Sequence, residues 1–207
     1  MVSRKYHKNI TKISFCLIIL IFLIMIFDYL NDHMRIDSTF AKSLNTATTT
    51  FPPQYLQIPD IALDVLVEPM QWQIVSENGN LTTAWILPLD AAGWHTNSAH
   101  AGVSGNVVLS GHHLRGEQIF NVFSLGWAEV GQKITLTDKM GQPFIYEIIE
   151  VTEPILSHRG TKADQERSLS YIAPTEHAQL TLVTGWPSFS TTHRIFVIAK
   201  LVQKINV

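Results

Sequence analysis

The chain has 207 residues, of which 46% are hydrophobic and 15% are charged, and its formal net charge at pH 7 is −2. This composition excludes an intrinsically disordered chain, and the slight negative charge argues against nucleic acid as the main partner. The only cysteine, Cys16, lies in an apolar N-terminal stretch. The sequence therefore excludes an intrachain disulfide and a cysteine zinc site, and it places no thiol beyond that stretch.

The N-terminus has the pattern of a membrane anchor. Residues 1–12 carry four lysines and arginines and no acidic residue, and residues 13–30 are almost entirely apolar, with Asp28 as their only charge. This run is just long enough to cross a bilayer as a helix, and basic residues before it predict a cytoplasmic N-terminus. A cleaved signal peptide is the alternative, but its small-residue site at Thr39-Phe40-Ala41 lies well beyond the run. We expect a single-pass protein of the cell membrane with an extracytoplasmic domain.

A polar tether over residues 31–53 precedes a folded domain over residues 54–204. Within that domain we expect short strands and two short helices, at Glu117–Leu125 and Glu166–Tyr171. Many short strands with turn signals between them and little helix predict an all-β, closed or nearly closed barrel. The expected strands are Tyr55–Pro59, Ala62–Val67, Gln71–Val75, Asn106–Ser110, Lys133–Thr137, Pro143–Val151, Leu180–Thr184 and His193–Ala199.

Two strand ends carry the residues of chemical interest. The run Leu180–Thr184 is rich in β-branched residues and is ended by Gly185-Trp186-Pro187, after which a polar loop leads to Arg194 at the start of the next strand. The run Gly105–Ser110 ends at Gly111 and is followed directly by His112 and His113. Two adjacent histidines alone would be interpreted as surface side chains. Together with the strand that ends at Gly185 and the strand that starts near Arg194, they indicate a functional site.

These stretches resemble the sortases, which carry a TLxTC strand end, a following strand led by arginine, and a GNVVLxGH strand end. The matching residues are Thr181–Gly185, Arg194 and Gly105–His112, and Ala92-Gly93-Trp94-His95 is similar to the approach to this site in sortases of classes D, E and F. The resemblance covers nearly all of the folded domain. It implies a sortase-type closed barrel of about eight strands with short helices, preceded by one N-terminal transmembrane helix.

The resemblance also implies a set of roles. His112 would be the acid and base, and Arg194 would hold the oxyanion or the substrate, while Gly185 stands where the family has its nucleophilic cysteine. Thr184, Trp186 and His113 would contact the substrate. The implied partners are a sorting-signal peptide of the LPxTG kind and an amine acceptor, with no cofactor and no metal. Without a thiol, transpeptidation stops before its first covalent step, so we expect an inactive protein that retains peptide binding.

Alternative readings remain open at this point. Ser188 or Ser190 could supply a hydroxyl nucleophile, although a hydroxyl is a far poorer nucleophile than a thiolate without strong activation. A metal hydrolase could instead use the cluster of His95, His100, His112, His113 and Glu117, but none of these lies at i, i+4 spacing within a clear helix, and no ligand set stands out. A third reading is a membrane-tethered β-domain with a purely structural role.

Overall fold

The computed structural model describes residues 25–26, 28–29, 50–70, 72–77, 79–157 and 159–205. The chain divides into two compact units, Met1–Thr49 and Thr50–Val207. In the first unit, residues 25–26 and 28–29 are helical. Within the described ranges no helix is both long and apolar enough to cross a membrane. The expected anchor over residues 13–30 and the tether over residues 31–53 lie mostly outside these ranges.

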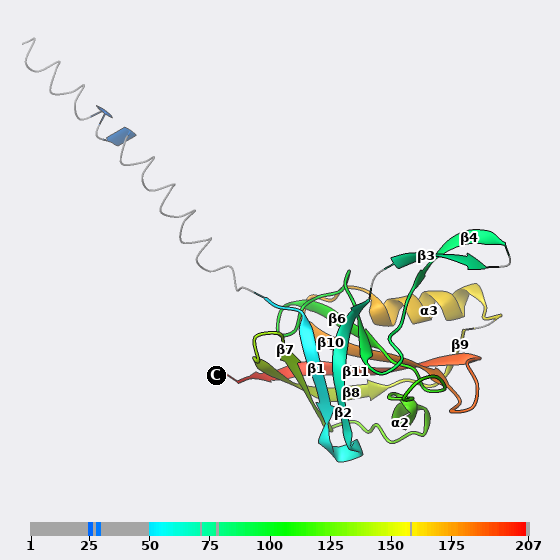
Figure 1. Cartoon of the computed structure of the whole chain (residues 1–207). Helices are drawn as coiled ribbons and strands as arrows, with labels where there is room; N and C mark the ends of the chain where they lie inside the picture. Colours follow the sequence, from blue (N-terminus) through cyan, green and yellow to red (C-terminus); the bar gives the residue numbers. More distant parts are fainter. Residues whose placement is uncertain are drawn as a thin grey trace, which may run out of the picture. The chain divides into compact units, whose positions relative to one another are not determined.

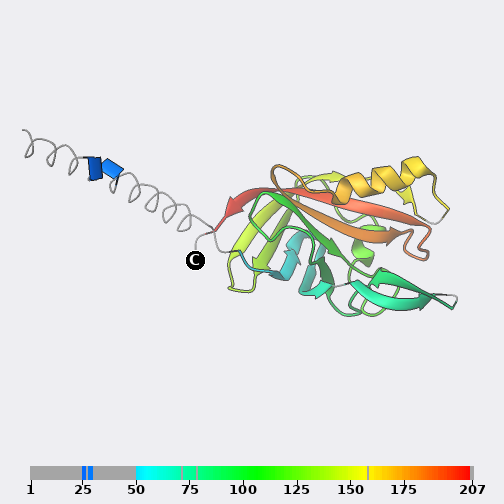
Figure 2. The ribbon, with the colours of Figure 1, turned by 90° about the horizontal axis from the view of Figure 1, so that it is seen from above.

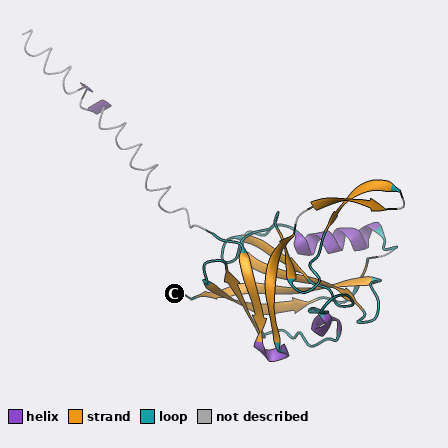
Figure 3. Ribbon diagram, viewed as in Figure 1, coloured by secondary structure: helices purple, strands orange, loops and turns teal. Residues whose placement is uncertain are grey.

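The second unit is built around a closed barrel of eight strands (Figures 1 and 3). The hydrogen-bonded order is β10-β6-β5-β2-β1-β7-β8-β11, and a further pairing of β10 with β11 closes the ring. This confirms the predicted all-β barrel with few helices. The eight strands are β1 (Pro53–Ile58), β2 (Leu63–Met70), β5 (Ala92–His95), β6 (Gly105–Ser110), β7 (Lys133–Asp138), β8 (Pro143–Val151), β10 (Ala178–Trp186) and β11 (His193–Lys204). The two-residue strand β9 (Ile155–Leu156) adds to the outer edge of β11, and a 3-10 turn, η1 (Pro59–Ile61), joins β1 to β2.

The barrel interior follows from the period-two alternation of its strands. In β8 the side chains of Phe144, Tyr146 and Ile148 are buried while their neighbours are partly exposed. Tyr146 is fully buried, its hydroxyl accepts a 2.9 Å hydrogen bond from the amide of Gly102, and burial raises its pKa to about 12. The opposite face of β11 presents Phe196 to a smaller apolar cluster outside the barrel. The fold therefore buries both faces of β11.

Two strands form a separate two-stranded ribbon, and the sequence predicted only one of them. β3 (Trp72–Glu77) corresponds to the strand expected at Gln71–Val75, but β4 (Asn80–Trp85) was not expected. The two pair with each other and with no barrel strand. Figures 1 and 2 show the ribbon projecting from the end of the barrel at which the β10–β11 loop lies. Because neither face of this ribbon is packed on the barrel core, β4 lacks the buried alternation by which strands are recognised.

Both predicted helices differ in length from those observed. The helix expected at Glu117–Leu125 is only the single turn α2 (Asn121–Ser124), because Gln118 takes a φ of 51° that a helix cannot contain. The helix expected at Glu166–Tyr171 is the longer α3 (Lys162–Ile172). A reciprocal capping box between Thr161 and Asp164 starts it, and both hydrogen bonds of that box are present.

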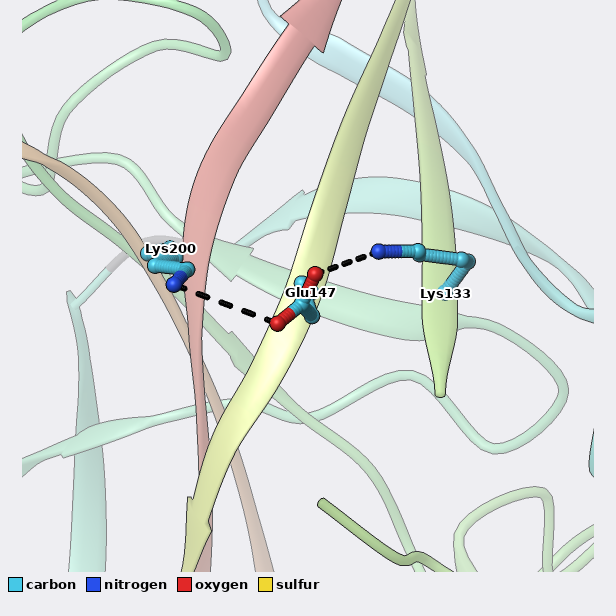
Figure 4. A network of polar contacts seen from close by, with 3 residues as sticks. All are labelled: Lys133, Glu147 and Lys200. Carbon is cyan, nitrogen blue, oxygen red and sulfur yellow. Dashed lines mark hydrogen bonds and ion pairs between the residues drawn. The ribbon is translucent and has the colours of Figure 1, made fainter. Parts of the chain in front are cut away.

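One polar network ties three barrel strands together on the outer surface (Figure 4). Glu147 on β8 pairs with Lys133 on β7 and, at 3.9 Å, with Lys200 on β11. The hydrogen bond from Lys133, with its charge, lowers the pKa of Glu147. The network bridges neighbouring strands far from the strand ends discussed below, and at its exposed position it contributes little to stability.

Candidate functional site

The ends of three barrel strands bring the predicted residues together. β6 and β10 are parallel neighbours, with Ser110 opposite Val183, so both end at the same edge of the barrel. β11 starts beside them, with Arg194 opposite Gly185. Side chains alternate between the faces of a strand. Since Leu182 packs in the barrel core, Val183 is directed outward and Gly185, two residues later, presents the same outer face.

A pocket of about 510 Å³ opens on this outer face. His112, Gly185 and Arg194 all line it, so the structure brings together the predicted acid and base, the predicted oxyanion-binding arginine and the position of the family's cysteine. Its apolar wall includes Met70, Trp85, Leu87 and Leu114, which come from β2, β4 and the segments that follow β4 and β6. This volume lies in the range of ligand pockets and is large enough for several residues of a peptide.

His112 is partly exposed to the pocket just beyond the end of β6. Its pKa is lowered, first by burial and then by the nearby charges of Arg115 and His113, while a hydrogen bond to the Leu87 backbone acts in the opposite direction. A lowered pKa keeps the imidazole neutral at pH 7, which is the form that can accept a proton.

His113 lies where a side chain at position 185 would project. An ideal Cβ built on Gly185 would stand 2.1 Å from Cε1 of His113 and 2.8 Å from its Nδ1. The ring is 4% exposed, and its Nε2 lies 2.7 Å from the backbone oxygen of Ser190. Because a carbonyl can only accept, Nε2 carries the hydrogen and Nδ1 does not when the ring is neutral. His113 thus fills the space beside Gly185 and connects the end of β6 to the β10–β11 loop.

Arg194 is a partly buried cation with no acidic partner within the described part of the chain. Its Nη1 donates weak hydrogen bonds to the backbone oxygens of Thr191, at 3.4 Å, and His193, at 3.3 Å. Burial lowers its pKa, although an arginine stays protonated under all ordinary conditions. The remaining donors of the guanidinium are thus available to a ligand in the pocket.

The other predicted contact residues are placed differently. The hydroxyl of Thr184 donates a 2.8 Å hydrogen bond to the backbone oxygen of Gly111, and the residue is 3% exposed. Its side chain therefore points away from the outer face, as expected for the residue before Gly185, although Thr184 still borders the pocket. Trp186 packs edge-to-face on His193 and does not line the pocket.

Neither of the two loop serines offered as substitute nucleophiles lines the pocket. The hydroxyl of Ser190 is directed to that of Thr192, at 3.5 Å. Among the described residues, no three histidines, cysteines, aspartates or glutamates form a group that could hold a metal ion. His95, His112 and His113 line the same pocket without forming such a group, whereas His100 lies outside the pocket lining and bonds the hydroxyl of Thr50.

Sequence reasoning missed two residues that line the pocket, Trp85 and Arg115, and it considered a third, His95, only in the sortase-like stretch and in the alternative metal cluster. Nε2 of His95 is hydrogen-bonded to the Ser110 hydroxyl at 2.8 Å, and burial lowers the pKa of His95. The ring of Trp85 stands 5.0 Å from that of His95. Arg115 adds a second cation to the pocket. Its position three residues after His112 was the available signal for Arg115, whereas no signal marked Trp85, because its strand was not expected.

Comparison with known proteins agrees with this fold. The family profile described as "Sortase domain" matches residues 56–202. No curated protein is similar enough in sequence to count as a match. Among solved structures, sortase A of Listeria monocytogenes is 23% identical with a TM-score of 0.52, and covers 76% of this chain and 92% of its own.

Two further solved structures represent other classes. A point mutant of sortase E from Streptomyces avermitilis is 21% identical with a TM-score of 0.53, covering 76% of this chain and 92% of its own. A sortase D transpeptidase of Clostridium perfringens is 18% identical with a TM-score of 0.51, covering 81% of this chain and 89% of its own. At these identities the likeness is one of fold. The fold is an eight-stranded sortase barrel, and with a family profile matched over most of its length the chain belongs to the sortase family.

Proposed function

We propose that this protein is a peptide-binding member of the sortase family that lacks transpeptidase activity. One observation carries the proposal: the pocket contains His112 and Arg194, but the position between their strands is Gly185, which has no side chain to attack a carbonyl. The peptide-sized pocket and the free donors of Arg194 support binding. The absence of any thiol outside the N-terminal stretch supports inactivity.

The ligand we propose is a sorting-signal-like peptide of the LPxTG kind. A solved structure of a sortase E from Streptomyces coelicolor, 18% identical to this chain with a TM-score of 0.50, holds a tripeptide in its active site. In this chain, the apolar wall of Met70, Trp85, Leu87 and Leu114 would take the aliphatic side chain and the proline ring of such a peptide. Arg194 would hold one of its carbonyl oxygens.

The sequence motifs favour a sortase of class D, E or F type. The apolar run at residues 13–30, preceded by basic residues, favours a single-pass anchor with the domain outside the cytoplasm. In that setting the protein would meet the surface proteins that carry sorting signals. It would hold them at the membrane without forming the thioester that leads to an amine acceptor.

Calorimetry on the full chain in mild detergent tests the proposal. The titrants are a peptide with the LPxTG sequence and the same residues in scrambled order. We expect the LPxTG peptide to bind with micromolar to millimolar affinity, the scrambled peptide to bind at least tenfold more weakly, and mass spectrometry to find the bound peptide intact. Absence of binding by either peptide would refute the binding role, and cleavage of the peptide would refute the inactivity.

A further inference from the structure

The pocket has a one-sided distribution of charge. Among the described residues, the lining includes two arginines, Arg115 and Arg194, and three histidines, and it includes no aspartate or glutamate. In a cleft with low-dielectric walls, charges of one sign produce a focused potential. The potential in this pocket is positive, so it favours an anionic group over a neutral one.

Arg194 is the cation that most needs such a group. It is partly buried, and its partners among the described residues are two backbone oxygens at 3.3 and 3.4 Å, which are long for hydrogen bonds to a charged donor. A desolvated cation without an anion is costly, and a peptide carbonyl restores only part of the lost solvation. A carboxylate, in contrast, can accept two parallel N–H bonds from one guanidinium.

The apolar part of the pocket limits what kind of anion would bind. A small inorganic anion would satisfy Arg194 but would leave Met70, Leu87 and Leu114 and most of the 510 Å³ unoccupied. A peptide that ends in the pocket supplies both parts, because its side chains cover the apolar wall and its terminal carboxylate reaches the cations.

We infer that the pocket selects peptides that end there with a free C-terminal carboxylate, in preference to peptides whose chain continues. This inference rests on the proposed function and narrows it, since the preferred ligand is a cleaved peptide rather than an intact sorting signal. A peptide bond placed at the same point offers Arg194 only a dipole, whereas the carboxylate carries a full charge. His112 adds a neutral donor or acceptor beside it.

The experiment compares two ligands that differ in one group. Acetylated Leu-Pro-Ala-Thr with a free carboxylate and the same peptide with a C-terminal amide are titrated into the full chain at pH 7 and low salt. We expect the carboxylate form to bind at least tenfold more tightly, because a charge-assisted bidentate contact replaces a neutral one. The preference should shrink as salt is added.

Two variants assign the preference to its source. Arg194→Gln should remove most of the difference between the two peptides, and the amide form, which binds through the apolar wall, should still bind and so report that the protein is folded. Arg167→Gln removes an exposed cation of the same kind on α3 and should leave the preference unchanged.

The outcomes separate this inference from the proposed function. Equal binding of the two peptides would overturn the carboxylate preference and leave peptide binding intact. If neither peptide bound, the proposed function would fail as well. Inorganic phosphate that displaced the carboxylate peptide at a similar concentration would show a small-anion site and would overturn the peptide part. A preference that survived Arg194→Gln would remove this residue from the explanation.

Discussion

The packing of His113 against Gly185 gives a prediction with a calculable size. A Cβ at position 185 would lie 2.1 Å from Cε1 of His113, whereas carbon atoms in contact stand about 3.5 Å apart. The ring would have to retreat by about 1.4 Å, and that shift would break the 2.7 Å hydrogen bond from Nε2 to the Ser190 oxygen. Overpacking of this kind costs about 1–3 kcal/mol, and the buried hydrogen bond about 1 kcal/mol more.

Gly185→Ala should therefore destabilise the folded domain by about 1.5–3.5 kcal/mol, after a gain of about 0.5 kcal/mol from the stiffer unfolded chain. The backbone at Gly185 does not have a positive φ, so the cost comes from the ring and not from the strand. Urea unfolding of Gly185→Ala, His113→Ala and the double variant measures it. We expect the double variant to be about as stable as His113→Ala alone, so the coupling free energy should equal the cost of Gly185→Ala, about 1.5–3.5 kcal/mol.

The control combines His113→Ala with Thr135→Ala, which lies on β7, a strand that does not line the pocket. The effects of these two substitutions on the free energy of unfolding should add. Additive effects for the Gly185 pair, or a Gly185→Ala variant as stable as the parent protein, would refute the argument.

The same steric clash should limit the reactivity of a cysteine introduced at position 185. We expect mass spectrometry to detect a covalent adduct of Gly185→Cys/His113→Ala with an LPxTG peptide and little adduct of Gly185→Cys alone. Adding His112→Ala to the double variant should abolish the adduct.

Three other predictions follow from features described above. Burial lowers the pKa of His95 and of His112 in the folded protein below the unfolded value. The stability that their neutral forms contribute is therefore present above about pH 6.5 and is lost as the pH falls through their lower folded pKa values. The urea concentration at the unfolding midpoint should decline from about pH 7.5 to about pH 5, and the decline should be less steep in His95→Gln. Thr184→Val should cost about 1–3 kcal/mol, measured by urea unfolding, because it leaves the buried oxygen of Gly111 without its hydroxyl donor, whereas unchanged stability would contradict that role. Protease added to intact protoplasts should degrade the folded domain and spare a small N-terminal fragment, and a fully protected domain would contradict the expected topology.

Most of the strands that pack on the core could be predicted from the sequence, although the four-residue barrel strand β5 was missed. β8 was predicted with its observed bounds, Pro143–Val151, because its alternating residues face the barrel interior. β4 was missed because the barrel buries neither of its faces. The length of α3 was underestimated because it has no buried residue, so its main signal was the capping pair Thr161 and Asp164 rather than an apolar stripe.

The residues of the candidate site were also predicted only in part. The resemblance to sortase motifs was the basis for expecting His112, Gly185 and Arg194 in one site, and the parallel pairing of β6 with β10 explains why their ends meet at one edge of the sheet. The strand pattern alone does not show which way each of the two adjacent histidines points. Both lie beyond the last residue of β6, where no ladder determines which way a side chain points. That His113 is buried against Gly185 is a result of tertiary packing alone.

The contact between His113 and Gly185 also constrains how this protein can change over generations. A side chain that arose first at position 185 would meet the ring, and a smaller residue that arose first at position 113 would leave a cavity and an unbonded Ser190 oxygen. Each first step is costly, whereas a side chain at position 185 adds no clash once the ring at position 113 has been replaced by a smaller residue. The effect of a substitution at either position therefore depends on the residue at the other, so a reactive side chain at position 185 is accommodated only together with a change at position 113.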